Sequence, residues 1–195
     1  MSAGVVPLIL AAGASQRMGR AKAAVAVGGR PALERILRVC ASAGVGPARV
    51  VVGAHPAAAR AVAPGARQVH NPRWALGRTT SIQAGLRAIG PAPAVLLWPV
   101  DVCLPDVYDL LALLEARRRH PDRALWVPSH AERRGHPVLL GPAAQAALLA
   151  LGPTQPARAV VRALAARGRV EHVERPSDAC LRDLNRPADV RGVLA

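Results

Sequence analysis

VVPLILAAGASQRMGRAK, residues 5–22, joins a short apolar run to a glycine-containing loop. The run Val5–Leu10 is aliphatic and partly β-branched and stops where the loop begins, as a buried parallel strand does. Small residues let a loop backbone approach a phosphate closely, and successive N–H groups of a turn form an anion site. The stretch therefore predicts a phosphate-binding loop after the first strand of an α/β fold.

The polar residues of this loop suit a triphosphate. Ser15 offers a hydroxyl donor, and Arg17 and Lys22 offer positive charge. Lys22 is the only lysine among 26 basic residues, which indicates a place where a compact ammonium is needed. A P-loop is excluded because arginine follows Gly19, and the dinucleotide pattern GxGxxG is absent. From these residues alone, an ordinary glycine-rich turn stays open as the alternative.

Apolar runs alternate with helical patterns along the rest of the chain. Further strands are predicted at Arg49–Gly53, Arg67–Val69, Ala94–Trp98, Leu125–Val127, Val138–Leu140 and Arg169–Val173. Helices are predicted at Pro31–Ala43, Pro56–Val62, Asp106–Arg119 (with Leu110, Leu111, Leu113 and Leu114 facing inward), Pro142–Leu151, Pro156–Arg167 and a segment capped by Thr79 or Thr80 that runs to Ile89. The alternation predicts a three-layer, Rossmann-like α/β fold with a mostly parallel central sheet, in one domain spanning residues 1–195.

Composition narrows the class of protein. No apolar run is long enough to cross a bilayer, and the first one lacks a basic leader, so we expect a cytoplasmic protein without a membrane partner. Cys40, Cys103 and Cys180 are odd in number and far apart, which argues against a disulfide framework or a cysteine zinc site. The net charge of +14 raises a nucleic-acid function. The arginines of the chain are dispersed and no groove-reading motif is present, so a nucleic-acid function stays the minor alternative.

Asp101 follows the predicted strand Ala94–Trp98 across Pro99 and Val100. Ligands of open α/β sheets bind at the carboxyl ends of the strands, so this carboxylate falls where a ligand is expected. Mg²⁺ in phosphoryl transfer takes one or two protein oxygens and completes its shell with phosphates. Asp101 is therefore a candidate metal ligand; a turn or helix-start aspartate is the structural alternative.

LAAGASQRMGRAK, residues 10–22, resembles the LAAGxSxRMGxxK signature of nucleotidyltransferases similar to molybdenum cofactor cytidylyltransferase and its guanylyltransferase relatives. This resemblance implies a nucleotidyltransferase fold with the loop wrapped around the triphosphate. It further implies that Arg17 and Lys22 stabilise charge as pyrophosphate leaves. The form Ala11-Ala12-Gly13 resembles the cytidylyl branch and favours CTP. The implied nucleotide contacts are Leu10, Ala11, Ala12, Gly13, Ala14, Ser15, Gly19 and Lys22.

Two acidic segments resemble the metal-binding segments of that family. PVDVCLPD, residues 99–106, resembles PVDxP and implies that Asp101 binds Mg²⁺, although Cys103 stands at the position of the proline. DLNRPADV, residues 183–190, resembles DIDTPEDL and places Asn185 where the family has its second metal-binding aspartate. An amide oxygen can still ligate Mg²⁺, so Asp101 and Asn185 are the implied ligands. Asp189 is expected to be structural.

Three more segments resemble the family. NPRWALGRTTSIQAGL, residues 71–86, resembles NPxWxxGMxSSLxAGL and implies nucleotide contacts from Thr80, Ser81 and Gly85. GHPVLL, residues 135–140, resembles the cytidylyl branch's GHPVLF and implies that His136 lies near the acceptor. LGPTQPAR, residues 151–158, stands in place of LxGDxGAR, with Thr154 and Pro156 replacing the aspartate and the second glycine. His55 is interpreted as scaffold at the edge of the sheet.

The sequence thus predicts a Mg²⁺-dependent enzyme with Arg17, Lys22 and Asp101 as its catalytic residues. The reaction would move CMP from CTP to a phosphorylated acceptor, with molybdopterin as the acceptor that the resemblance implies and a molybdenum enzyme as a partner. One alternative is a transferase of the same fold that uses GTP, UTP or ATP on a sugar phosphate. Another is a non-catalytic nucleotide-binding module or maturation partner of a molybdenum enzyme, motivated by the departures at Cys103, Thr154 and Asn185.

Overall fold

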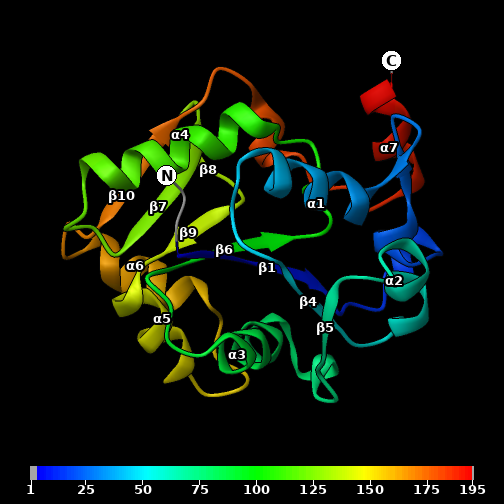
Figure 1. Cartoon of the computed structure of the whole chain (residues 1–195), viewed down its shortest axis with the longest axis horizontal. Coiled ribbons are helices and arrows are strands. Elements are labelled where there is room, and N and C mark those ends of the chain that lie inside the picture. Colours follow the sequence, from blue (N-terminus) through cyan, green and yellow to red (C-terminus); the bar gives the residue numbers. More distant parts are fainter. Residues whose placement is uncertain (1–3, 195) are drawn as a thin grey trace.

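The structure, a computed structural model, describes residues 4–194 and is built around a central sheet (Figure 1). The predicted domain bounds, residues 1 and 195, lie outside the described residues. The sheet runs in the order β10-β7-β9-β6-β1-β4-β5, with β8 paired to β7. Its strands are β1 Val5–Ala11, β4 Arg49–Val52, β5 Arg67–His70, β6 Ala94–Pro99, β7 Leu125–His130, β8 Arg133–Arg134, β9 Val138–Leu140 and β10 Val170–Glu174.

Most of the sheet is parallel, as predicted. The strands β6, β1, β4 and β5 pair in parallel, and so do β7 and β10. The short β9 is antiparallel to both β6 and β7 and links the two parallel groups. The carboxyl ends of β1, β4 and β6 consequently meet at one edge, where the fold places its ligands.

Helices cover both faces of the sheet and make three layers (Figure 1). Against one face pack α1 Ala32–Ser42 and α4 Val107–Arg119; against the other pack α3 Arg78–Ile89, α5 Pro142–Leu149 and α6 Arg158–Ala165. The short helices α2 Pro56–Val62 and α7 Pro187–Leu194 and the two-stranded sheet of β2 Ala26–Val27 and β3 Arg30–Pro31 complete the described chain. The three-layer α/β prediction is confirmed.

The pattern of β1 shows how the sequence divides its apolar residues between two cores. Ile9 packs with α1 and α4, whereas Leu8 and Leu10 pack with α3 on the opposite face. All three side chains are at most 8% exposed. Because neighbouring strand residues point to opposite faces, a strand covered on both sides reads as a continuous apolar run. Each buried aliphatic side chain contributes roughly 1.5–3 kcal/mol.

Two sequence predictions about helices were wrong in detail. The N-cap of α3 is Gly77, whose φ of 122° suits glycine, while Thr79 and Thr80 lie in the first turn. Neither threonine caps the helix, because the Thr79 hydroxyl donates to the carbonyl of Gln155 instead and the Thr80 hydroxyl to that of Gly77. On α4, Leu111 is 44% exposed, because residues one position apart on a helix face different directions.

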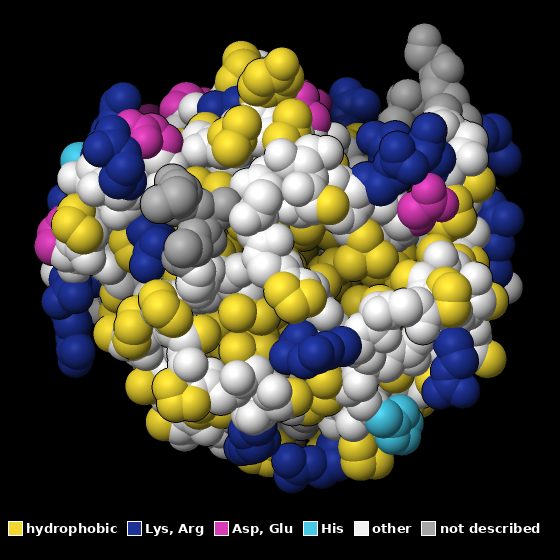
Figure 2. Space-filling view, viewed as in Figure 1, with side chains coloured by type: hydrophobic (Ala, Val, Ile, Leu, Met, Phe, Trp, Pro, Cys, Tyr) yellow, Lys and Arg dark blue, Asp and Glu magenta, His cyan; other side chains and the backbone are white. Residues whose placement is uncertain are grey.

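Basic side chains are dispersed on the face that Figure 2 draws. Within residues 4–194, no helix combines the length and apolar character needed to cross a membrane. On the face shown in Figure 2, most lysine and arginine side chains lie in separate groups around the margin, with apolar and neutral surface between them. This dispersion matches the scattered arginines of the sequence.

Candidate active site

The loop after β1 is wound tightly against the end of the strand. It forms 3₁₀ turns at Gln16–Met18 and Lys22–Ala24. Ser15 adopts a left-handed backbone with φ 53°, and its carbonyl accepts hydrogen bonds from the amides of Met18 and Gly19 at 2.9 and 3.2 Å. The Met18 side chain is 4% exposed and packs into the core. Packing therefore anchors the loop from below.

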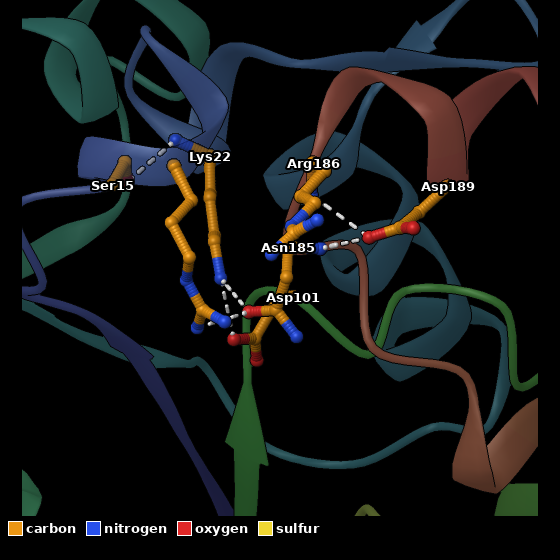
Figure 3. A network of polar contacts seen from close by, with 7 residues as sticks. Ser15, Lys22, Asp101, Asn185, Arg186 and Asp189 are labelled. Atoms are coloured by element: carbon orange, nitrogen blue, oxygen red, sulfur yellow. Dashed lines mark hydrogen bonds and ion pairs between the residues drawn. The ribbon is translucent and has the colours of Figure 1, made fainter.

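Three segments far apart in the sequence bring an ammonium, a carboxylate and an amide together (Figure 3). The Lys22 ammonium donates to Asp101 Oδ2 at 2.9 Å and to Asn185 Oδ1 at 2.7 Å. Arg17 also donates to Asn185 Oδ1, at 3.3 Å. The Lys22 and Asp101 side chains are only 16% and 15% exposed, so the attraction between them is screened less than in a surface ion pair.

Asn185 is held in place by its neighbours. The backbone N–H groups of Asn185 and Arg186 both donate to Asp189 Oδ2 at 2.8 Å (Figure 3). These two hydrogen bonds lower the pKa of the Asp189 carboxyl because they favour its charged form. The amide of Leu184 donates to the carbonyl of Asp101 at 2.9 Å and ties this segment to the end of β6. Asp189 thus positions Asn185, in keeping with its predicted structural role.

These groups lie at a cavity of about 550 Å³, which we call the loop pocket. It is lined by Leu10, Ala11, Ala12, Gly13, Ala14, Ser15, Gln16, Arg17, Ala21, Lys22, Ala23, His55, Trp74, Ala75, Gly77, Arg78, Ser81, Pro99, Val100, Asp101 and Asn185. The volume lies within the usual range for small-molecule sites. The backbone of the loop lines one side of this pocket, and the charged groups of Lys22, Arg17 and Asp101 line the other. Both features suit a polyanionic ligand.

The donor set fits a hard divalent cation. Asp101 Oδ2 and Asn185 Oδ1 already converge on one cation, the Lys22 ammonium. Within residues 4–194, no group of three or more His, Cys, Asp and Glu side chains is arranged to hold a metal ion. Mg²⁺ needs no such group, because it binds through one or two protein oxygens and takes the rest from water and phosphates.

The model of the MobA-like NTP transferase domain matches residues 7–170. The chain belongs to this family. It is therefore a nucleotidyltransferase, an enzyme that acts on a nucleoside triphosphate. No curated protein matches its sequence.

Several solved structures resemble this MobA-like transferase in fold. A nucleotidyl transferase from Methanothermobacter thermautotrophicus superposes with a TM-score of 0.82 at 21% identity, covering 98% of this chain and 96% of that one. A Mycobacterium tuberculosis protein in complex with manganese gives 0.73 at 21%, covering 98% of each chain. CMP:2-keto-3-deoxy-manno-octonic acid synthetase complexed with CTP gives 0.75 at 15%, covering 98% and 97%. At these identities the likeness shows the fold.

Most residues that the sequence singled out in this MobA-like transferase line the loop pocket. Residues 10–15, Arg17, Lys22, Ser81, Asp101 and Asn185 all do. Gly19, Thr80 and Gly85 are not among the lining residues. Thr80 is 1% exposed, and its hydroxyl accepts from Asn71 at 3.0 Å and donates to carbonyls of the preceding loop. A Cβ at Gly85 would clash with the Leu8 side chain and come within 2.9 Å of Val51 Cγ2.

His136 lies outside the loop pocket, in a neighbouring cavity of about 460 Å³. The residue is half-buried, and its Nδ1 is shielded from solvent with no hydrogen-bond partner among the described residues. Burial lowers the pKa of its imidazole to about 4, and the nearby Arg78 guanidinium adds to this effect. The ring is therefore neutral at physiological pH.

His55 belongs to the loop pocket, not merely to the scaffold. Its Nε2 lies 2.9 Å from the carbonyl oxygen of Ala14, so the imidazole braces the loop that follows β1. The signal was present in the sequence: His55 follows β4, at the same edge of the sheet as Asp101. Asp183, beside the metal-ligand candidates, has a raised pKa because it is partly buried and faces the negative charge of Asp101.

Proposed function

We propose that this transferase moves CMP from CTP to a phosphorylated small-molecule acceptor, with Mg²⁺ bound by Asp101 and Asn185. The observation that carries the proposal is the convergence of one carboxylate and one amide oxygen on the Lys22 ammonium, beneath a loop built for phosphate. The Ala11-Ala12-Gly13 form of the loop supports CTP as the donor. A solved structure of similar fold that holds CTP adds to this support.

In this proposal, the acceptor phosphate oxygen attacks the α-phosphorus of CTP in line. A new P–O bond forms to the acceptor, and the bond from the α-phosphorus to the bridging oxygen breaks, so pyrophosphate leaves with that oxygen. Asp101 and Asn185 would hold Mg²⁺, which would supply positive charge against the triphosphate. Arg17, Lys22 and the loop amides neutralise the leaving pyrophosphate. Catalysis then consists of positioning and electrostatic stabilisation.

Lys22 has two roles in this scheme. Its ammonium donates hydrogen bonds to the two oxygens that would hold the metal ion. With both oxygens committed to Mg²⁺, the Lys22 ammonium would be available to contact the triphosphate. Arg17 shares Asn185 with Lys22 and lines the same cavity, so both cations are placed to act on one ligand.

The family resemblance supports molybdopterin as the acceptor and a molybdenum enzyme as partner. Other nucleotides, a sugar phosphate acceptor, or a non-catalytic binding role are the competing proposals. We assign the whole chain, residues 1–195, to one transferase domain. A cytoplasmic setting is part of the proposal, because Cys40, Cys103 and Cys180 are all free and buried.

Thermal melting with CTP, GTP, UTP and ATP, each with and without Mg²⁺, tests the proposal. A ligand at one hundred times its dissociation constant stabilises the fold by about 2.7 kcal/mol, a clear shift in melting temperature. We expect the largest shift with CTP, and only when Mg²⁺ is present. Equal shifts with all four nucleotides would refute the CTP assignment, and no shift with any of them would refute the nucleotide site.

A further inference from the structure

The cavity that contains His136, which we call the apolar pocket, adjoins the loop pocket. The two share Leu10, Gly77, Arg78 and Pro99. A molecule in one pocket can therefore touch a molecule in the other, with Arg78 at their common rim. This is the arrangement that transfer between two bound substrates requires.

The walls of the apolar pocket are aliphatic. They include Ile82 of α3, Leu97 of β6, Val138 of β9 and Val160 of α6, each at most 8% exposed. Among the described residues that line it, none is Asp or Glu. Its volume of about 460 Å³ is enough for a small ring compound.

Two polar side chains of the pocket, Thr79 and Gln155, are committed to the protein. The Thr79 hydroxyl donates to the carbonyl of Gln155 at 2.6 Å, and the Gln155 side chain accepts from the amide of Gly152 at 2.7 Å. These bonds fix residues 152–155 beside α3. His136 Nδ1, in contrast, is shielded and finds no hydrogen-bond partner within residues 4–194. A bound molecule with one hydrogen-bonding group could satisfy it.

A sugar or polyol would fit this wall poorly. Each hydroxyl that gives up water without gaining a protein partner costs about 1–3 kcal/mol, and a polyol brings several. The segment that departs from the family pattern forms part of the wall, because Thr154 and Pro156 both line the pocket.

We propose that the apolar pocket holds the body of the acceptor, and that the acceptor is the phosphate monoester of a compact, largely apolar ring compound. Its phosphate lies toward Arg78 and the loop pocket, and one hydrogen-bonding group of the ring meets His136 Nδ1. The assignment rests on the proposed function, since it identifies the second substrate of the same transfer.

Two phosphate monoesters that differ in their bodies provide the test. Binding of 2-naphthyl phosphate and of sorbitol 6-phosphate is measured by calorimetry on the whole protein, without nucleotide. Thr154→Trp and Ala157→Phe each add a ring at the lining of the pocket, and Thr154→Ala is the matched control without added bulk. Thr154 is exposed, so its replacement leaves the core intact even where Ala157→Phe disturbs folding.

We expect wild type and Thr154→Ala to bind 2-naphthyl phosphate at least about tenfold more tightly than sorbitol 6-phosphate, a gap near 1.4 kcal/mol. Thr154→Trp should weaken naphthyl phosphate binding about tenfold and leave the CTP melting shift unchanged. Equal binding of the two esters, or unaltered binding by the blocked variants, overturns the inference. The nucleotide melting shift is a separate readout, so a failed nucleotide site and a failed acceptor assignment give different results.

Discussion

The loop pocket and the apolar pocket are built from different parts of the fold. The loop pocket takes its working groups from segments that follow strands, and hydrogen bonds between side chains fix them, as Lys22, Asp101 and Asn185 illustrate. The apolar pocket takes its walls from the buried faces of helices and strands, and packing fixes them. One pocket is defined by charge and the other by shape.

Because the two pockets are held in place differently, substitutions in them should have different effects. Removing a charge from the loop pocket leaves the core untouched, so activity should fall while stability holds. Changing volume beneath the apolar pocket disturbs α3 and its contacts with the sheet, so stability should fall first. Variants that break this rule would show that the two pockets are not independent.

Lys22→Ala should give the largest effect and tests the charged side of the comparison. In the described part of the chain, the ammonium is the only side-chain group that donates to both Asp101 and Asn185, so its loss removes the charge set against the leaving pyrophosphate. We expect transfer to fall roughly 10²- to 10³-fold, the cost of losing one preorganised charge-stabilising group. Pyrophosphate release under saturating CTP and acceptor measures it.

Arg20→Ala is the matched control for Lys22→Ala. It removes a positive charge from the same loop, yet Arg20 is exposed and does not line the loop pocket. Its activity should stay within about twofold of wild type, since isolated surface charges contribute little. Equal losses in the two variants would mean that overall charge, and not the position of Lys22, attracts the nucleotide.

Two glycine substitutions, with smaller expected effects, sharpen the comparison between the pockets. A Cβ at Gly85 would clash with Leu8 and come within 2.9 Å of Val51 Cγ2, beneath α3. Gly85→Ala should therefore lower the free energy of unfolding by about 1–3 kcal/mol, the usual cost of overpacking. A Cβ at Gly13 meets nothing within 4 Å. Gly13→Ala should leave stability within about 0.5 kcal/mol and weaken CTP binding, because the methyl occupies space meant for phosphate.

Urea unfolding and CTP titration of both glycine variants make the measurement. A stable Gly85→Ala protein would mean that α3 can move away from the sheet, and the apolar pocket would then have no fixed shape. Unchanged CTP affinity in Gly13→Ala would place the phosphates away from the backbone of residues 11–15.

The loop pocket was largely predictable from the sequence because its groups sit at short, readable offsets from strand ends. Residues 10–22 follow β1, and Asp101 follows β6. The same rule applied to β4 would have identified His55. Asn185 was found only through family resemblance, since no local pattern marks an asparagine 84 positions after Asp101 as its neighbour.

The apolar pocket was not predictable in the same way. Its walls come from α3, β6, β9 and α6 together with residues 153–157. Apolar spacing predicts that such residues are buried but not that they leave a cavity between them. His136 was identified by resemblance, and its lack of a hydrogen-bond partner depends on tertiary packing. Likewise the threonines of α3 resembled a cap because hydroxyls favour helix starts, and Gly77 took that position.

The pH dependence of stability gives the smallest and last test, and it concerns the apolar pocket. The pKa of His136 is lowered to about 4 by burial, whereas an unfolded histidine titrates near 6.5. As pH falls from about 6.5 to 4, the unfolded chain gains a proton that the folded protein does not, so the free energy of unfolding falls. The ring is only half-buried, and we expect about 1–3 kcal/mol from this group.

His136→Gln should remove that part of the decline. Other titrating groups contribute alike to both proteins, so the difference between their urea-unfolding curves across this range isolates His136. If the free energies of unfolding of the two proteins fell in parallel with pH, water would reach the imidazole. The contrast between the charged loop pocket and the apolar pocket would then be lost.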